Sequence, residues 1–252
     1  MFKFNSTLLL MVVILLLQAC SAVPPQEAVN AEPAVHDVND IVKKDKVYPI
    51  DVYDPWEGMN RHTYIFNAQL DDYVLLPILN VYQRYVPDFL RQGVRNFYSN
   101  LTSFVHTINS GLQLNTESTA NNGLRFISNT TIGVLGIFDV ATGMGFPEMK
   151  EDFGQTLGYW GVGEGPYIVL PLLGPSNLRD TTGIAVDFAF NDILLNEFGM
   201  NGNEGWLYFY YMMYGIDTRA KIPFRYYESG SPFEYETIRM LYTNGRRVLI
   251  AE

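Results

Sequence analysis

A glycine-rich stretch at residues 158–180, GYWGVGEGPYIVLPLLGPSNLRD, contains the residue types that could first suggest ligand chemistry. Its GVGEGP segment has the glycine density of a loop that cradles a phosphate. A dinucleotide-binding loop needs a strand before the glycines and a helix after them, because the N-terminus of that helix receives the pyrophosphate. Here Pro166 and the extended-looking run YIVLP follow, and no Gly-Lys-Ser/Thr occurs. The segment therefore predicts no nucleotide site, and its glycines favour non-helical backbone that passes close to neighbouring helices.

The residue types that carry catalysis do not form a constellation elsewhere. His62 and His106 each lie alone near an amphipathic segment, and the sequence has no serine-hydrolase elbow, HExxH, EF-hand loop or CxxC. Asp71 and Asp72 are adjacent, and adjacent residues on a helix do not face each other, so we interpret them as a solvated face or helix end. The sequence therefore predicts a protein that is not an enzyme and that uses no metal and no cofactor.

Arg179 and Asp180 end the glycine-rich stretch and begin a predicted helix. In a structural interpretation Asp180 caps that helix and Arg179 pairs locally. In a functional interpretation the two side chains line a polar channel. The spacing leaves both interpretations open.

Composition narrows the class of protein. The chain has 252 residues, with 17 Lys+Arg against 27 Asp+Glu and a formal net charge of −10, so it lacks the basic surface that nucleic acid requires. Charged residues make up 17% of the sequence, below the roughly 25% of an average soluble domain, while aromatic residues reach 14%. This balance favours one large domain that exposes apolar surface to something other than water.

The N-terminus has the pattern of a secretory leader. Lys3 precedes an unbroken apolar run at 8–17, which is well short of the roughly 20 residues of a membrane-spanning helix. The run ends in Leu-Gln-Ala-Cys, which resembles a lipobox, and Cys20 is the only cysteine of the chain. We expect a signal peptide at 1–19 and lipid attachment at Cys20, the alternative being an ordinary signal peptide followed by a free thiol.

The segment after the leader has no helical or strand period. Residues 20–47 are therefore predicted to be a lipidated, flexible tether. Ser21 occupies the position after Cys20 at which bacterial lipoproteins retained in the inner membrane favour Asp. The sequence thus predicts an outer-membrane location, with the folded domain at 48–252.

Apolar residues recur at helical spacing through most of that domain. Asp54, Pro55 and Glu57 have the spacing of a capping box, which predicts a helix that begins there and is interrupted at Pro77. Gly133 and Gly136, in a further predicted helix, would leave room for close helix contact. The later helices are expected at 88–108, 119–138, 181–195, 206–220 and 232–250.

Between the helices predicted at 119–138 and 181–195, residues 139–153 have the glycines and proline of a loop or hairpin, with apolar residues at its tip. The predicted fold is therefore mainly α, with amphipathic helices, one Gly/Pro-rich irregular segment and this short loop or hairpin. After residue 20 no apolar run is long enough to span a bilayer. The aromatic helices could lie in a membrane interface, or they could be the core-facing helices of a soluble domain.

Several longer motifs resemble those of the MlaA (VacJ) family of outer-membrane lipoproteins that maintain phospholipid asymmetry. The resemblance covers roughly residues 52–250. Its motifs are DPWEGMNR at 54–61, YVPDFLRQGVRNFYSNL at 85–101, GIFDVAT at 136–142, EDFGQTLGYWGVGEGPYIVLPLLGPSNLRD at 151–180 and DTRA at 217–220.

The resemblance implies a ring of helices in the inner leaflet of the outer membrane with an amphipathic channel through it. Members of the family associate with trimeric porins and remove mislocalised phospholipid from the outer leaflet. They pass the lipid to a periplasmic carrier and need no ATP. The rival functions are a structural porin-associated lipoprotein without transport and an envelope lipase. The candidate channel or gate residues are Gly143, Met144, Gly145, Phe146, Glu164, Arg179 and Asp180.

Overall fold

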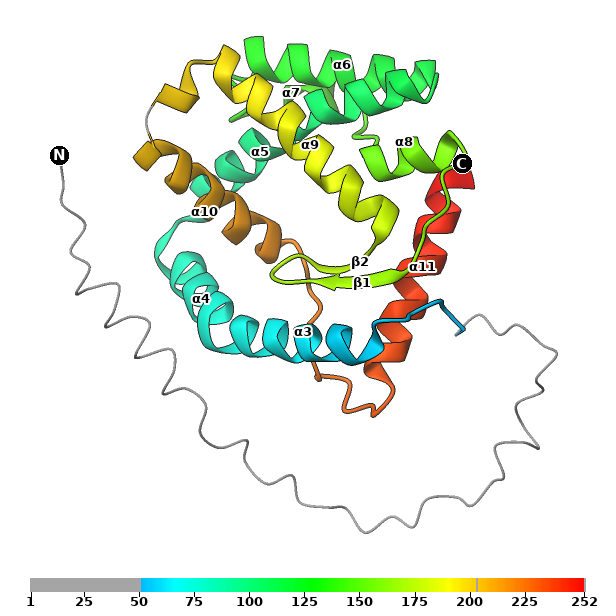
Figure 1. Ribbon diagram of the computed structural model, residues 1–252. Coiled ribbons are helices and arrows are strands. Elements are labelled where there is room, and N and C mark those ends of the chain that lie inside the picture. Colours follow the sequence, from blue (N-terminus) through cyan, green and yellow to red (C-terminus); the bar gives the residue numbers. More distant parts are fainter. Residues whose placement is uncertain (1–50, 203, 252) are drawn as a thin grey trace, which may run out of the picture. The chain divides into compact units, whose positions relative to one another are not determined.

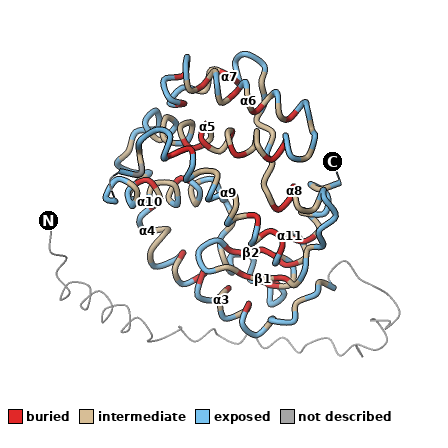
Figure 2. The backbone as a smooth tube through the Cα atoms, turned by 45° about the horizontal axis from the view of Figure 1, so that its top comes forward, coloured by how far each residue is buried: buried red, intermediate tan, exposed pale blue. Residues whose placement is uncertain are grey.

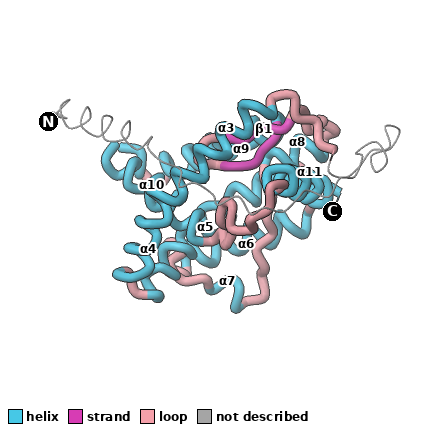
Figure 3. Tube along the Cα trace, turned by 90° about the horizontal axis from the view of Figure 1, so that it is seen from below, coloured by secondary structure: helices cyan, strands magenta, loops and turns pink. Residues whose placement is uncertain are grey.

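The computed structural model describes residues 51–202 and 204–251, which belong to one compact unit, Val47–Glu252. The predicted signal peptide at 1–19, the tether at 20–47 and Cys20 lie outside the described residues. The described part is mainly helical, as predicted (Figures 1 and 3). Its two-stranded hairpin lies within residues 167–177, in the segment predicted to be irregular, whereas the loop or hairpin predicted at 139–153 contains a short helix at 140–143 and no strand. Its elements are α3 (Glu57–Leu70), η1 (Asp71–Leu75), α4 (Leu76–Tyr85), α5 (Asp88–Leu112), α6 (Thr116–Thr131), α7 (Val140–Gly143), α8 (Phe153–Tyr159), β1 (Tyr167–Leu170), β2 (Gly174–Asn177), α9 (Leu178–Glu197), η2 (Met200–Gly202), α10 (Glu204–Ala220) and α11 (Glu234–Ala251).

The first helix begins where the sequence predicts, but the predicted cap is wrong. Trp56 occupies the N-cap and no side chain caps the helix. The carboxylate of Asp54 instead accepts hydrogen bonds from Asn60, Tyr235 and Arg239, since buried donors from α11 are within its reach. The start of α3 is thus stabilised by tertiary contacts and not by a capping box.

Pro77 does not interrupt the helix, contrary to the prediction. A proline lacks an N–H, and its ring crowds the carbonyl one turn earlier. A π-helical turn, η1, lies directly before it, and the Leu76 N–H donates to the carbonyl of Asp71, five residues back. This wider turn lets α3 continue through η1 into α4.

The helix predicted at 119–138 is shorter than expected. α6 is capped by Asn115, whose side chain accepts from the Ser118 N–H at 3.0 Å, and it ends at Thr131. Gly136 then has φ +88°, and a Cβ at this position would lie 2.4 Å from the Cβ of Asn100. Glycine does permit close approach to α5 here, but from a turn and not from a helix.

The glycine-rich stretch forms the end of α8, an extended connection and an antiparallel hairpin in which Tyr167 pairs with Asn177. Asn60 of α3 donates to the Tyr167 carbonyl at 3.0 Å and accepts from the Val169 N–H at 2.9 Å. Asn67, two turns later, bonds the Leu170 carbonyl and the Leu172 N–H, both at 2.9 Å. The two amides thus satisfy the free edge of β1 as a third strand would.

Two small apolar clusters provide the packed core. One gathers Tyr98, Leu101, Leu194, Leu195 and Tyr210 from α5, α9 and α10. The other gathers Tyr64, Tyr167, Val169 and Tyr235 from α3, β1 and α11. None of the described helices is both long and apolar enough to cross a membrane.

Candidate functional site

The side chains are distributed in the opposite sense to that of a water-soluble domain. Among the described residues, polar and charged side chains outnumber apolar ones in the buried class, and a long series of large apolar side chains is exposed. Figure 2 shows where the buried and the exposed positions lie along the backbone. Soluble proteins rarely bury charged residues unless these are paired. The buried positions therefore define where this chain holds its polar chemistry.

Two helices bury polar stripes with the same spacing. On α3 and the η1 turn that continues it, the buried residues include Asn60, Tyr64, Asn67 and Asp71. On α6 the buried residues are Ser118, Asn122, Arg125 and Asn129. Each set advances by four, three and four residues, which places its members on one helical face. The sequence shows these patterns, but our sequence interpretation followed the apolar faces and missed them.

The apolar faces of the same helices are exposed. Ile65 and Phe66 of α3 are 46% and 50% exposed, and Leu124 and Ile127 of α6 are 42% and 59% exposed. Leu124 and Ile127 therefore do not pack into the core, although Phe126 of α6 packs against the first apolar cluster. The core-facing interpretation fails for these exposed residues of α3 and α6, whereas it holds for the apolar face of α5, which contributes to that cluster.

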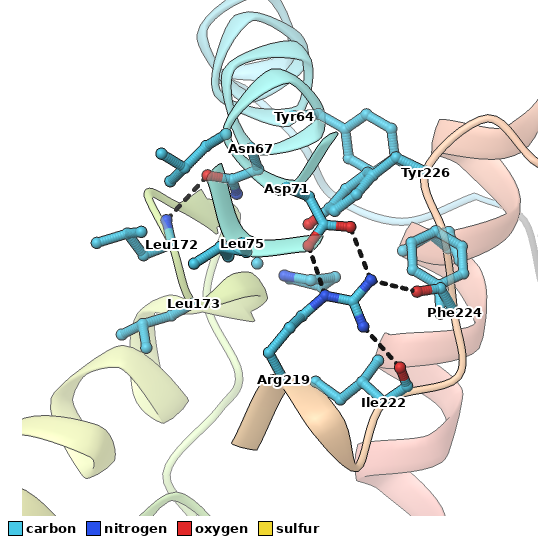
Figure 4. Close-up of a pocket in the computed structure, with 14 residues that line it drawn as sticks. Tyr64, Asn67, Asp71, Leu75, Leu172, Leu173, Arg219, Ile222, Phe224 and Tyr226 are labelled. Carbon is cyan, nitrogen blue, oxygen red and sulfur yellow. Dashed lines mark hydrogen bonds and ion pairs between the residues drawn. The ribbon is translucent and has the colours of Figure 1, made fainter. Parts of the chain in front are cut away.

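Asp71 lies at the wall of an amphipathic pocket and is buried, so the interpretation of this residue as solvated is wrong. Its two carboxylate oxygens accept from Nε and Nη2 of Arg219 at 2.5 and 2.7 Å, and Arg219 also donates to the carbonyls of Ile222 and Phe224 (Figure 4). The hydrogen bonds that Arg219 donates to Asp71 outweigh burial and raise the pKa of Arg219. The DTRA motif thus supplies a fixed cation to the pocket.

The pocket has a volume of about 250 Å³, slightly below the roughly 300–1,000 Å³ of small-molecule sites. Leu172 and Leu173, from the turn of the hairpin, line one side of it, and Asp71 and Arg219 lie on the other side (Figure 4). An apolar wall facing a charged one suits an amphipathic ligand. The lining residues are Tyr64, Asn67, Leu70, Asp71, Leu75, Leu172, Leu173, Gly174, Pro175, Arg219, Ile222, Phe224, Tyr226 and Ile238.

None of the predicted channel residues lines this pocket. Arg179 and Asp180 are buried and pair with each other at 2.9 Å. Asn177, and not Asp180, caps α9, because its side chain accepts from the Asp180 N–H at 2.7 Å. The predicted cap is therefore wrong, whereas the local pairing of Arg179 is present.

Asp180 belongs to a network that joins α8, α9 and α11. Arg246 donates from Nε to Asp180 at 2.8 Å, and from Nη1 and Nη2 to Asp152 at 2.6 and 2.7 Å. Tyr242 adds a bond to Asp180 at 2.7 Å. Burial alone would raise the pKa of Asp152, but the hydrogen bond and charge of Arg246 outweigh it, and the pKa is lowered. Glu164 lies apart from this network and pairs with Arg247 at 2.6 Å.

The predicted gate is fastened to α6. Gly143 ends α7, Met144 is about half exposed, and Gly145 has φ +88° with open space beside it. The carbonyl of Phe146 accepts from Nη1 of Arg125 at 2.6 Å. The segment that contains the four predicted gate residues is thus held to α6 at Phe146.

Further contacts hold the rest of this loop. Arg125 also bonds Thr142 and pairs with Asp139 at 3.0 Å. The side chain of Asn122 donates to the Met149 carbonyl at 2.7 Å and accepts from the Met149 N–H at 3.1 Å. The polar stripe of α6 therefore sets the position of the loop at both ends.

The two histidines of the described part, His62 and His106, contact different backbone carbonyls. His106 is partly buried, with Nδ1 at 2.6 Å from the Glu151 carbonyl, and this burial lowers its pKa. His62 is exposed and contacts the Gly58 carbonyl one turn earlier. The described residues contain no group of three or more His, Cys, Asp or Glu side chains placed to hold a metal ion.

Several known proteins are similar to this chain in sequence or in structure. A solved structure described as the structural basis for maintenance of bacterial outer membrane lipid asymmetry superposes with a TM-score of 0.64 and 31% identity, covering 78% of this chain and 98% of that one. An uncharacterised protein of Rickettsia conorii is 40% identical over 146 residues, or 58% of each chain. The match thus spans little more than half of the rickettsial relatives' length.

Two named relatives extend the comparison. The intermembrane phospholipid transport system lipoproteins MlaA of Escherichia coli and Shigella flexneri are each 36% identical over 174 residues, covering 67% of this chain and 66% of theirs. The model of the family described as MlaA lipoprotein matches residues 52–249, which is most of the chain. This chain therefore belongs to the MlaA lipoprotein family.

Proposed function

We propose that this chain is an outer-membrane lipoprotein that removes mislocalised phospholipid from the outer leaflet and passes it to a periplasmic carrier for return to the inner membrane. The observation that carries the proposal is the inverted distribution of side chains. Exposed apolar faces on α3 and α6 suit a lipid surrounding. The buried polar stripes suit a protein in lipid, because its polar groups must find hydrogen-bond partners within the protein where water is absent. Relatives named as phospholipid transport lipoproteins support the same assignment.

The physical task of such a protein is to move a charged head group past hydrocarbon. Unaided crossing costs several kcal/mol or more, because a polar group loses its hydrogen bonds to water. In our proposal the helices form a ring in the inner leaflet with an amphipathic channel, which supplies polar partners to the head group while the acyl chains stay in lipid. The pocket between Arg219 and Leu172 has the required pairing of a charged and an apolar wall.

The anchor and partners complete the proposal. Lipid on Cys20, with residues 20–47 as a tether, would hold the domain at the periplasmic leaflet of the outer membrane beside a trimeric porin. Cys20→Ala should leave the domain folded but mislocalised, as measured by membrane fractionation and proteolysis. Unchanged retention in the outer membrane would contradict the lipid anchor.

The transport activity has its own test. Cells lacking the chain should accumulate phospholipid in the outer leaflet, as measured by labelling of surface-exposed lipid, and the wild-type chain should clear it. Protein purified with its porin should carry phospholipid. Porin association without clearance and without bound lipid would favour the structural lipoprotein, and release of fatty acid from labelled phospholipid would favour a lipase.

The loop that contains Gly143, Met144, Gly145 and Phe146 is the proposed gate, and Glu164, Arg179 and Asp180 are the further channel candidates. Arg125 fastens the loop on one side, and Gly145 gives it a flexible point. A disulfide engineered between this loop and α6 should stop clearance of surface phospholipid, and reduction should restore it. Full clearance by the oxidised protein would exclude a moving gate.

A further inference from the structure

The corner between α4 and α5 concentrates positive charge in a chain whose formal net charge is −10. Arg84, Arg91 and Arg95 occur there, with Asp88 the only acidic residue between the first and the last. Arg91 and Arg95 lie four residues apart on α5 and so share a face. Asp88 pairs with Nη2 of Arg91, whereas Arg95 is exposed and makes no hydrogen bond or ion pair with any residue between 51 and 251 that the structure describes.

Two buried donors at this corner also lack partners. The hydroxyl of Tyr82 on α4 and Nε of Arg91 have no hydrogen-bond acceptor within the described part of the chain. Burial raises the pKa of Tyr82, and the charge of Asp217 raises it further. The charges of Arg91 and Arg95 act in the opposite direction, so both arginines lie close enough to Tyr82 to influence it. Buried polar groups in native proteins are normally satisfied, and such a pair marks a place where a bound acceptor fits.

A second carboxylate near this corner is already neutralised. Asp217 on α10 is buried and pairs with Lys221 at 2.6 Å. Counted together, Arg84, Arg91, Arg95 and Lys221 exceed Asp88 and Asp217 by two positive charges. Asp217 and Arg219 are two residues apart and face different sides of α10, so this corner is distinct from the pocket of Figure 4.

The surroundings of the corner are apolar. Val81, Tyr85, Phe89 and Leu90 are 58%, 72%, 73% and 49% exposed. A ligand that satisfies both sets of groups carries an anion with several acceptor oxygens next to hydrocarbon. A phosphate accepts several charge-assisted hydrogen bonds from guanidinium groups, and a phospholipid joins that phosphate to acyl chains.

We propose that Tyr82, Arg91 and Arg95 bind the phosphate of a phospholipid head group at the α4–α5 corner, with the acyl chains along the exposed apolar residues beside it. The site rests on the proposed function, because that function brings phospholipid to this chain. It adds a place where the lipid is held, and it names the residues that hold it.

The test is a lipid titration of the full chain in detergent, followed by native mass spectrometry. One probe is phosphatidylglycerol, and the other is diacylglycerol with the same acyl chains but no phosphate. Arg95→Gln should weaken phosphatidylglycerol binding about tenfold and Tyr82→Phe about threefold, because each removes donors to the phosphate. Neither should change diacylglycerol binding. Arg84→Gln, the matched loss of an arginine from the same corner, should bind like the wild type.

Each outcome decides the proposal. Equal phosphatidylglycerol affinity of the wild type and Arg95→Gln would overturn it, as would an equal loss in Arg84→Gln, which would show diffuse attraction to charge. Inorganic phosphate titrated without lipid distinguishes the two sources of phosphate. Arg95-dependent binding of that ion, with no preference for phosphatidylglycerol over diacylglycerol, would make the ligand free phosphate and overturn the lipid assignment.

The proposed function can fail separately. If the wild type clears surface phospholipid in cells but Arg95→Gln keeps its affinity, only the site is wrong. If the wild type neither binds phosphatidylglycerol nor clears surface lipid, the proposed function is wrong. The exposed Arg95 and the isosteric Tyr82→Phe change allow each variant to fold, which circular dichroism checks.

Discussion

The two polar stripes have the same spacing but hold different kinds of partner. The stripe on α3 reaches far along the chain: Asn60 bonds a strand more than one hundred residues away, and Asp71 pairs with Arg219, 148 residues away. The stripe on α6 holds a nearby loop, since Arg125 meets Asp139 only 14 residues on. A contact between segments far apart in the sequence fixes the fold, whereas a contact with a neighbouring loop can open without unfolding it. The comparison supports a rigid hairpin side and a mobile loop side.

The largest expected effect comes from breaking the long-range ion pair. Asp71→Asn leaves the buried charge of Arg219 without its carboxylate, which should lower the free energy of unfolding by about 3–5 kcal/mol. Denaturant unfolding of the full chain measures this. Asp72→Asn, at the exposed neighbouring position, is the control and should change stability little. Equal effects of the two variants would remove the distinction between buried and exposed acids in η1.

A smaller loss should follow from removing one amide of the α3 stripe. Asn60→Ala leaves the Tyr167 carbonyl and the Val169 N–H buried without partners, and should cost about 2–3 kcal/mol of unfolding free energy. Gln69→Ala removes an exposed amide from the same helix and serves as the control. Hydrogen exchange should rise throughout β1 in the first variant. Unchanged exchange there would mean that the hairpin is held by other contacts.

The α6 stripe should respond locally. Arg125→Gln removes the bonds to Phe146, Thr142 and Asp139, and should destabilise the closed loop by about 2 kcal/mol. We expect faster hydrogen exchange at 139–147 with little change in β1, and Glu117→Gln on the same helix as a silent control. Global unfolding of Arg125→Gln would show that the two stripes do not differ in kind.

The smallest expected effect is a difference between the two stripes in how hydrogen exchange depends on pH. Burial alone would raise the pKa of Asp139, but hydrogen bonds from Thr142, Asn129 and Arg125 outweigh it and lower the pKa to about 2. Because this pKa lies below that of a free carboxyl group, the stabilisation is complete above about pH 4 and is lost as the pH falls towards about 2. Loop exchange should therefore rise in acid, while the neutral amides of Asn60 and Asn67 keep β1 protected.

A charge-free loop is the control for this pH dependence. In Asp139→Asn the acid-induced rise in exchange at 139–147 should disappear, because no carboxylate remains to titrate. The same profile in the variant and the wild type would assign the pH dependence to another group.

Much of the architecture could be predicted from the sequence. The mainly helical fold, the starts of α3 and α5 and the absence of a helix after GVGEGP follow from local periodicity, glycine and proline. The two wrong helix-cap predictions have one cause in common. Asp54 and Asp180 have the residue type of a helix cap, but buried arginines compete for their carboxylates. Which partner wins depends on distances between elements that no local pattern contains.

The same limit applies to the candidate site. The residues at 143–146 were placed in a loop from their glycines, and the structure adds that Arg125 fastens it. Asn60, Asn67 and Arg219 were missed, because an asparagine on a helix or an arginine near the end of a helix is ordinarily exposed to solvent. The 4-3-4 spacing of Asn60, Tyr64, Asn67 and Asp71 was visible in the sequence, but the direction of this polar face was not.

The sequence by itself determined the family, the helical periods and the positions at which glycine or proline shapes the backbone, because these depend on residue types at short spacing. Only the tertiary structure decided which face of each helix is buried. In water the apolar face turns inward, and in this chain the polar faces of α3 and α6 do so. The physical reason is that their amides and charges find their partners in other segments of the folded chain, namely β1, the 139–149 loop and the DTRA end of α10.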